Sequence, residues 1–312
     1  MEVKGAILTG GYGKRMQGFD PETPKNLLPL RGNYTILHRQ LRDFKLGGVN
    51  EVYMLTGYMS SKIEERFGEE WMGIRIRYLR EERPMGTLWS IKNLFSTDTS
   101  NFIIKNGDTI CDLNLKDLID ISEKSRRSGF VTAVKMRSPY GIIKISGNKV
   151  TTIEEKPIMN NYINAGTYLF KRNAIDYIVR MYDGKDIEMT VLKAMAAAGD
   201  LGVLKYDGFW LSVDSLKDYE TIRGIYEKRV DHEFGFSILM DNSIEAHFIR
   251  SAELTPSGRY EIAVERGLVS INGIKHVSGA KLRVNNGDKM HIEKGTVLIA
   301  SKDLLRDMVS FL

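Results

Sequence analysis

Short apolar segments alternate with amphipathic ones along residues 5–135, and this alternation constrains the fold more than any other feature of the sequence. The segments that we expect to be strands are Gly5–Leu8, Glu51–Thr56, Ile74–Leu79, Phe102–Lys105 and Val131–Val134. Helical spacing of apolar residues lies between them, as in Ile36, Leu37, Leu41 and Phe44, and serines can cap a helix over Ser60–Phe67. Repeated strand–helix units of this length predict an α/β fold with a mixed, mostly parallel sheet.

The pattern changes after residue 140. Three adjacent strands are expected within 141–170, then helices at 174–181 and 188–198, and a helix ending near Arg229 that closes the first domain. Beyond Asp231 short apolar runs are separated by SGR, NG, SG and NNGD, which is typical of antiparallel β structure. No repeat of 20–50 residues supports a β-helix. We therefore expect two domains, 1–231 and a small all-β domain 232–312.

Composition excludes several classes of protein. Hydrophobic residues make up 42% and charged residues 27% of the 312 residues, which is typical of a globular chain. The net charge of +5 is small and gives no reason to expect nucleic acid as a partner. No apolar run approaches the ~20 residues that span a bilayer, and Cys111 is the sole cysteine. We expect a cytoplasmic protein without a membrane partner, and the five scattered histidines do not predict a zinc or iron site.

A glycine-rich loop follows the first expected strand, in LTGGYGKRMQGFDPETPK of residues 8–25. Glycines there let backbone N–H groups approach a phosphate closely. The loop is not a P-loop, because Arg15 stands where that motif needs Ser or Thr. It is not a dinucleotide fingerprint either, because Met16 replaces the third glycine and no acidic residue ends the second strand.

The loop and six later segments resemble the sugar-1-phosphate nucleotidyltransferases, also called NDP-sugar pyrophosphorylases. The family pattern G-G-x-G-x-R-[ML], followed by P-K-x-L-x-P, occurs here as GGYGKRM and PKNLLP. The later segments, in order, are Pro84-Met85-Gly86-Thr87, Asn106-Gly107-Asp108, Tyr140-Gly141, Glu154-Glu155-Lys156-Pro157, Asn164-Ala165-Gly166 and Gly208-Phe209-Trp210 with Asp214. The resemblance covers about residues 3–229.

This resemblance implies an enzyme with a Rossmann-like, GT-A-like sheet and a defined reaction. An oxygen of a sugar 1-phosphate attacks the α-phosphorus of a nucleoside triphosphate, pyrophosphate leaves, and Mg²⁺ is the cofactor. The catalytic residues implied are Arg15, which would hold the triphosphate, and Lys25, which would contact the α- and β-phosphates. The nucleotide-binding residues implied are Leu8, Gly10, Gly11, Gly13, Gly86, Thr87 and Gly107.

Two carboxylates are expected to hold the metal. Asp108 ends a strand at the sheet edge where α/β proteins bind ligands, whereas Asp112 is expected to cap the next helix. The second carboxylate is Asp214, because GFWLSVDSLKD resembles the glucose-1-phosphate cytidylyltransferase segment. When the segment is aligned without gaps on the pattern of most of the family, Ser212 instead of Asp214 falls on the metal-binding Asp. The sequence therefore does not determine whether Ser212 alters the metal site.

The sugar-phosphate side of the site is implied by the later motifs. Its residues are Gly141, Glu155, Lys156, Asn164, Ala165 and Gly166. The nucleobase is not determined, because Pro-x-Gly-Thr is similar to guanylyl- or adenylyltransferases while the Trp–Asp segment is similar to cytidylyltransferases.

The C-terminal part resembles a cupin around Gly287-Asp288 and Glu293-Lys294-Gly295, but Leu298 replaces the metal histidine. We expect a cupin-like domain without metal, acting in assembly or regulation, in a chain that could form a homo-oligomer. Two alternatives remain: a cytidylyltransferase for a non-sugar phosphate, and a non-catalytic subunit that senses nucleotide sugars.

Overall fold

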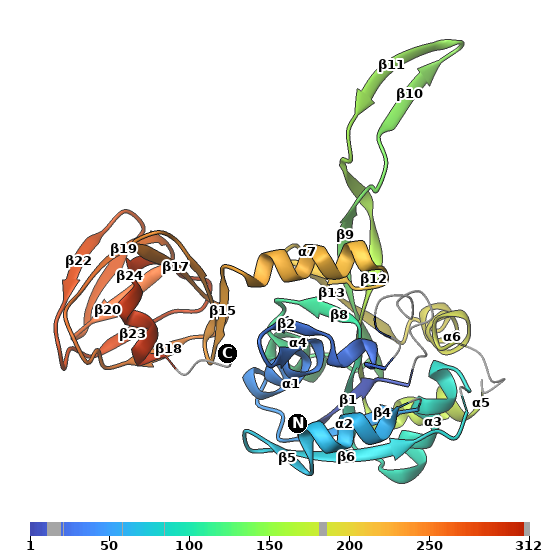
Figure 1. Cartoon of the computed structure of the whole chain (residues 1–312). Helices are drawn as coiled ribbons and strands as arrows, with labels where there is room; N and C mark the ends of the chain where they lie inside the picture. The colour runs from blue at the N-terminus through green and yellow to red at the C-terminus, as the bar shows by residue number, and fades with distance from the viewer. Residues whose placement is uncertain (11–19, 21, 58, 84, 181–185, 309–312) are drawn as a thin grey trace.

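The computed structural model describes residues 1–10, 20, 22–57, 59–83, 85–180 and 186–308. An eight-stranded sheet forms the centre of the N-terminal part, in the order β13-β9-β12-β7-β1-β4-β6-β5 (Figure 1). Its strands are β1 (Val3–Leu8), β4 (Glu51–Thr56), β5 (Glu70–Trp71), β6 (Ile74–Arg80), β7 (Asn101–Asn106), β9 (Gly129–Arg137), β12 (Ile158–Phe170) and β13 (Leu201–Tyr206). Strands β7, β1, β4 and β6 are parallel, and β12 is antiparallel to both β7 and β9. The mixed, mostly parallel sheet is confirmed.

Helices α1 to α6 pack around this sheet on both of its faces, whereas α7 packs against β2 and β14 beside it. The helices are α1 (Ile36–Leu46), α2 (Ser60–Phe67), α3 (Thr87–Thr97), α4 (Leu115–Glu123), α5 (Ile175–Arg180), α6 (Lys193–Ala197) and α7 (Leu216–Tyr226), with short turns η1 (Lys25–Leu27), η2 (Arg172–Ala174) and η3 (Glu188–Leu192). Leu41 and Phe44 of α1 pack in one core with Val52, whereas Leu88 of α3 packs in another with Tyr53. The strand residues Val52 and Tyr53 thus point to opposite faces, as the pleat requires.

The cap predicted for α2 is wrong. Met59, in the left-handed conformation at φ 59°, occupies the N-cap position, and no side chain caps the helix there. Ser60 is instead the first helical residue.

Two small strand pairs lie beside the main sheet. Strand β8 (Thr109–Cys111) pairs antiparallel with β14 (Trp210–Ser212), with Thr109 opposite Ser212. Strand β2 (Pro29–Arg31) pairs with β3 (Tyr34–Thr35) just before α1. The first pair joins segments about 100 residues apart in the sequence, and it brings the chain after β7 next to the chain after β13.

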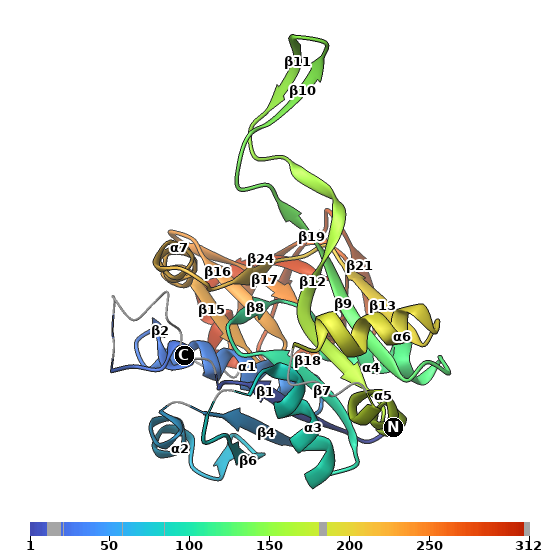
Figure 2. The same ribbon diagram turned by 90° about the vertical axis from the view of Figure 1, so that its right-hand side faces the viewer.

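A hairpin of β10 (Ile142–Ser146) and β11 (Lys149–Glu154) extends from the ends of β9 and β12. Figures 1 and 2 both show it projecting away from the remainder of the molecule. Every residue of its two strands is exposed.

The C-terminal part consists of two antiparallel sheets around one core. The six-stranded sheet has the order β15-β16-β17-β24-β19-β22, and the four-stranded sheet has the order β18-β23-β20-β21. Their strands are β15 (Arg229–His232), β16 (Gly235–Leu239), β17 (Ser243–Phe248), β18 (Ala252–Leu254), β19 (Tyr260–Arg266), β20 (Leu268–Ile271), β21 (Ile274–Val277), β22 (Lys281–Val284), β23 (Met290–Ile292) and β24 (Val297–Ser301), followed by the turn η4 (Lys302–Asp307). A boundary after residue 231 would fall within β15, so we propose a division between α7 and β15.

Buried charges link β15 to the N-terminal part. The Asp231 carboxylate accepts hydrogen bonds from Arg229 Nε (2.8 Å), Tyr226 Oη (2.7 Å) and Tyr34 Oη (3.1 Å), and Arg39 Nε lies 3.3 Å from it. All these side chains are buried or nearly so. Because an ion in a protein interior is stable only when it is paired, this cluster requires all its members.

Asp112 belongs to the same cluster, so its expected role as a helix cap is wrong. Its carboxylate accepts hydrogen bonds from Arg39 (2.8 Å) and from Arg229 (2.6 and 2.9 Å). The N-cap of α4 is Asn114, whose side-chain oxygen accepts from the Lys116 N–H at 3.1 Å. The Asp112 carboxylate is thus occupied by the two arginines rather than by backbone N–H groups of α4.

We predict that Asp231→Asn destabilises the folded chain by about 3–5 kcal/mol, because it leaves Arg39 and Arg229 buried with one carboxylate fewer. Urea unfolding measures this loss. Asp303→Asn is the control, since its exposed ion pair with Arg306 should change stability by less than about 0.5 kcal/mol. Equal losses in the two variants would contradict the importance of the cluster.

His232 provides a pH-dependent test of the same region. Burial, together with the nearby Arg42 guanidinium, lowers the pKa of His232 from 6.5 to about 3. An unfolded histidine therefore holds more protons than the folded one between pH 3 and 6.5, and the free energy of unfolding falls as the pH decreases through this range.

We predict that His232 contributes a loss of about 2 kcal/mol in unfolding free energy between pH 7.5 and pH 5. In the unaltered chain the Phe234 N–H donates to His232 Nδ1. His232→Asn keeps a side-chain acceptor for this N–H, but the asparagine cannot be protonated. Urea unfolding at the two pH values should therefore show a smaller pH effect in the variant. An unchanged pH effect would mean that the ring is not held neutral.

Candidate active site

The candidate site begins where β1 and β7 end side by side. The Gly107 N–H donates to the Leu8 carbonyl at 3.1 Å. A Cβ atom at Gly107 would lie 2.6 Å from that carbonyl and 2.4 Å from Asn26 Nδ2, so a larger residue does not fit. The two strand ends are thus held close by a glycine, at the edge where open α/β sheets bind ligands.

A cavity of about 270 Å³ lies at this edge. It is lined by Leu8, Gly10, Glu81, Gly86, Thr87, Ser90, Asn106, Gly107 and Asp108. The structure therefore brings together Leu8, Gly10, Gly86, Thr87 and Gly107, all expected from the sequence to bind nucleotide. The other expected residues, Gly11, Gly13 and the catalytic Arg15, lie outside the described residues.

The N-terminus of α3 forms one wall of the cavity. Gly86 precedes the helix at φ 92°, a conformation that disfavours any residue with a Cβ atom. The Thr87 hydroxyl accepts a hydrogen bond from the Ile187 N–H at 3.1 Å, which ties this end of the helix to the turn η3.

Sequence reasoning missed Glu81, which lines the cavity. The Ser90 hydroxyl donates to its carboxylate, and the Glu81 N–H donates to the Thr56 carbonyl at 2.8 Å. Burial raises the pKa of Glu81, although the hydrogen bonds from Ser90 and Met85 oppose this. In the sequence Glu81 lies in the charged run REER, which is typical of a solvated surface. Its position five residues before Gly86 could have indicated that it lies near the nucleotide.

Lys25 lies between the two carboxylates that were expected to hold metal. Its Nζ donates to Asp108 Oδ2 at 3.0 Å and to Asp214 Oδ1 at 3.2 Å. The Lys25 side chain is 11% exposed, whereas those of Asp108 and Asp214 are 32% and 50% exposed. The Lys25 side chain is therefore largely enclosed, whereas the carboxylates remain open to a ligand.

The pairing of β8 with β14 brings Asp214 to Asp108. The Val213 N–H donates to the Asp108 carbonyl at 2.9 Å, which extends the strand pair by one bond. Asp218 accepts from the Asp214 N–H at 3.2 Å and forms a capping box with Ser215 at the start of α7. Ser212 donates to Asp214 Oδ2 at 2.7 Å, so the serine orients the carboxylate.

These residues fit a hard divalent cation. Mg²⁺ prefers carboxylate oxygens and commonly binds one or two of them together with phosphate oxygens and water. Asp108 and Asp214 provide such a pair. Within the described residues no group of three or more His, Cys, Asp or Glu side chains gathers at one point, as an all-protein metal cage would need.

The motif Asn164-Ala165-Gly166 lies next to the cavity on β12. Gly166 has φ 71°, and a Cβ atom there would lie 2.7 Å from the side chain of Asn106, which lines the cavity. The Ala165 carbonyl accepts from Trp210 Nε1 at 3.0 Å, and Asn164 accepts from the Gly166 N–H at 3.0 Å. This part of the expected sugar side is therefore adjacent to the nucleotide side.

Gly141, Glu155 and Lys156 do not line the cavity. They lie at the exposed base of the β10–β11 hairpin, where Lys156 Nζ is 3.7 Å from Glu155 Oε1. Residues 158–166 of β12 span up to roughly 26 Å at ~3.3 Å per residue. The structure thus does not bring these three residues together with Lys25.

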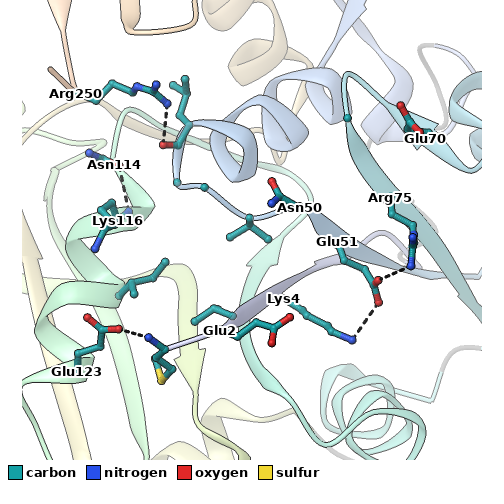
Figure 3. A pocket seen from close by; sticks show the side chains of 18 residues that line it. Glu2, Lys4, Asn50, Glu51, Glu70, Arg75, Asn114, Lys116, Glu123 and Arg250 are labelled. Atoms are coloured by element: carbon teal, nitrogen blue, oxygen red, sulfur yellow. Dashed lines mark hydrogen bonds and ion pairs between the residues drawn. The ribbon is translucent and has the colours of Figure 1, made fainter. Parts of the chain in front are cut away.

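A larger cavity of about 920 Å³ lies at the opposite, amino-terminal edge of the sheet (Figure 3). Many of its charges pair with one another: Glu51 with Lys4 and Arg75, and Glu123 with the Met1 amino group. None of the expected site residues lines it. The smaller cavity is therefore the candidate site.

Comparisons with known proteins place the chain among known sequences and folds. A family profile described as Nucleotidyl transferase matches residues 4–229. Mannose-1-phosphate guanyltransferase beta-B of Xenopus laevis is 29% identical over 242 residues, covering 74% of this chain and 66% of the relative. The mannose-1-phosphate guanylyltransferase catalytic subunit beta of Dictyostelium discoideum is 31% identical over 237 residues, covering 72% and 64%. The chain thus spans just under two thirds of these relatives.

Solved structures share the fold. HddC from Yersinia pseudotuberculosis superposes with a TM-score of 0.57 at 24% identity, covering 72% of this chain and 99% of HddC. Apo-UDP-glucose pyrophosphorylase gives a TM-score of 0.59 at 17% identity, covering 73% and 99%. Because the family profile covers β1 to the start of β15 and includes Lys25, Asp108 and Asp214, the chain belongs to the nucleotidyl transferase family.

Proposed function

We propose that this protein is an enzyme that transfers a guanylyl group from GTP to a sugar 1-phosphate, with mannose 1-phosphate as the first candidate, and releases pyrophosphate. The observation that supports this most is the bonding of Lys25 to both Asp108 and Asp214 beside the cavity. A phosphoryl group entering there meets the Lys25 ammonium group and two carboxylates that can share a metal ion. The names of the relatives supply the guanylyl and mannose parts of the proposal.

The reaction needs positioning and charge neutralisation, since both substrates are anions. Mg²⁺, when bound, would offset charge on the triphosphate, and Asp108 and Asp214 would hold it. Lys25 would then leave the carboxylates and bind the α- and β-phosphates. Arg15 would hold the triphosphate, as its fork of donors suits phosphate oxygens.

Glu81 supports guanine as the base. The Watson–Crick edge of guanine carries two adjacent N–H donors, and an ionised carboxylate accepts two parallel hydrogen bonds. Uracil and thymine offer one such donor. HddC, whose fold is similar, has been solved in complex with GMP-PN. The backbone of Gly10 and Gly86 would contact the base from its other sides.

For the sugar side we propose Asn164, Ala165 and Gly166 as the fixed part. Gly141, Glu155 and Lys156 would join them only if the base of the hairpin bends toward β7. The positive φ of Lys156, 45°, is unusual for a residue with a side chain and marks a position where such a bend could occur.

We propose a cytoplasmic location, a cupin-like metal-free role for the C-terminal sheets in assembly, and a homo-oligomeric enzyme. No helix among the described residues is long and apolar enough to cross a bilayer.

We predict that Lys25→Met lowers kcat for pyrophosphate release by about 10²–10³-fold, which corresponds to about 3–4 kcal/mol at the transition state. GTP and mannose 1-phosphate with Mg²⁺ are the substrates, and a coupled assay detects pyrophosphate. Lys217→Met removes an exposed lysine of the nearby helix α7 and should keep kcat. Full activity in Lys25→Met would remove Lys25 from the catalytic centre.

We predict that Glu81→Gln lowers kcat/KM for GTP by about 10²-fold, because the amide leaves one guanine donor facing another donor. The same change should lower the ratio of GTP to UTP activity, since an amide matches the acceptor–donor edge of uracil. Glu82→Gln alters the exposed neighbour and should leave the ratio unchanged. The same ratio in all three proteins would show that Glu81 does not read the base.

A further inference from the structure

Two lysine side chains converge on one tyrosine ring in the N-terminal sheet. Lys135 Nζ lies 5.5 Å and Lys205 Nζ lies 5.3 Å from the centre of the Tyr162 ring. An ammonium group within about 6 Å of an aromatic ring is attracted to the face of that ring. We refer to Lys135, Lys205 and Tyr162 as the lysine–tyrosine cluster.

The cluster lies at the edge of the sheet that carries the candidate site. Strand β12 is antiparallel to both β7 and β9, so β7 and β9 run in the same direction, and β13 is parallel to β9. Lys135 lies two residues before the end of β9, and Lys205 lies one residue before the end of β13. Both lysines therefore share the carboxyl edge of the sheet with Asp108, which follows β7.

The register of the strands places the cluster next to Asn164, which we propose for the sugar side. Asn164 lies opposite Ala133, and Ala133 lies opposite Lys205, so these three residues form one row across the sheet. Tyr162 and Lys135 form the next row, about 7 Å further along β12. Residues paired across strands, and residues two apart in one strand, share a face of the sheet. The cluster thus adjoins the end of the sugar side that is remote from the cavity.

The positive charges of this cluster are not neutralised by carboxylates. Within the parts of the chain that the structure describes, no ion pair includes Lys135 or Lys205. Glu188 is bonded instead to Tyr168 Oη, at 2.8 Å, on the far side of Asn164 from the cluster. Because like charges repel, this arrangement favours an anion that contacts both ammonium groups.

We propose that the lysine–tyrosine cluster binds a second anionic group of the sugar substrate, a carboxylate or a phosphate on the carbon farthest from the 1-phosphate. This inference rests on the proposed function, since it takes the sugar to lie over Asn164 with its 1-phosphate directed toward Asp108. A neutral hexose in that position gives the two lysines no charged partner. An anionic oxygen there accepts a charge-assisted hydrogen bond from each ammonium group. The preferred substrate is therefore an acidic sugar 1-phosphate rather than mannose 1-phosphate itself.

The first experiment compares three sugars with GTP and Mg²⁺: mannose 1-phosphate, mannuronic acid 1-phosphate and mannose 1,6-bisphosphate. We expect one of the two acidic sugars to give a kcat/KM at least about 10-fold above that of mannose 1-phosphate. Which of the two is preferred distinguishes a carboxylate from a phosphate. Pyrophosphate release from mannose 1-phosphate without a gain for either acidic sugar would overturn this inference and leave the proposed function intact.

The variant Lys135→Gln/Lys205→Gln tests whether the two charges cause the preference. It should lower the ratio of kcat/KM for the preferred acidic sugar to that for mannose 1-phosphate by about 10-fold or more. The control Lys275→Gln/Lys281→Gln removes two exposed lysines of the C-terminal sheets and changes the net charge equally, so it should leave the ratio unchanged. The same ratio in all three proteins would contradict the proposal, because a purely structural role of the lysines would affect both sugars alike.

Calorimetric binding to the full chain with Mg²⁺ keeps this test independent of turnover. If none of the three sugars releases pyrophosphate, the proposed function fails, but the affinities still test the cluster. We expect the preferred acidic sugar to bind at least about 10-fold more tightly than mannose 1-phosphate, and Lys135→Gln/Lys205→Gln to abolish the difference. Equal affinities in the unaltered chain, or a difference that persists in this variant, would overturn the proposal.

Discussion

The buried cluster around Asp231 is the interaction on which the remaining structure depends. Arg39 of helix α1 contacts Asp231 of β15 and also donates to the Cys111 carbonyl and the Asp112 carboxylate at the end of β8. One side chain therefore ties the C-terminal sheets, the first helix and the short strand β8 together. Since β8 pairs with β14, the same cluster determines where Asp214 lies. Buried charges destabilise a protein unless all of them are paired. The paired cluster around Asp231 thus positions Asp214, which lies outside the cluster.

At the site itself charge is arranged in the opposite way. Asp108 and Asp214 are partly exposed and share Lys25, rather than being enclosed by several partners. A metal ion and a phosphate can therefore exchange with this lysine without unfolding any element. The backbone that supports these side chains is held by short contacts. Gly107 packs directly against the Leu8 carbonyl, and the capping box of α7 lies beside Asp214. Rigid support with exchangeable charges suits a reaction whose substrates are all anions.

Local patterns in the sequence predicted much of this. The strand at Glu51–Thr56 was predictable because residues 52–55 form a continuous apolar run, as a strand buried on both faces requires. The order of the motifs indicated Lys25, Asp108 and Asp214. Asp112 was misassigned because its partner Arg229 lies 117 residues away, beyond the reach of local patterns. Glu81 was missed because burial of a carboxylate cannot be read from REER. The projection of the hairpin was equally unreadable, since alternation predicts a strand but not what covers it.

The central claim is that the residues around Lys25 transfer a nucleotidyl group rather than merely bind one. Phosphorus NMR of the purified chain with GTP, mannose 1-phosphate and Mg²⁺ tests it directly, because substrates and products have distinct resonances. We predict that signals of pyrophosphate and of a guanosine diphosphate sugar appear together in equal amounts, at the expense of both substrates. Unchanged substrates, or GTP consumed to GDP and inorganic phosphate with the sugar phosphate intact, would contradict the account.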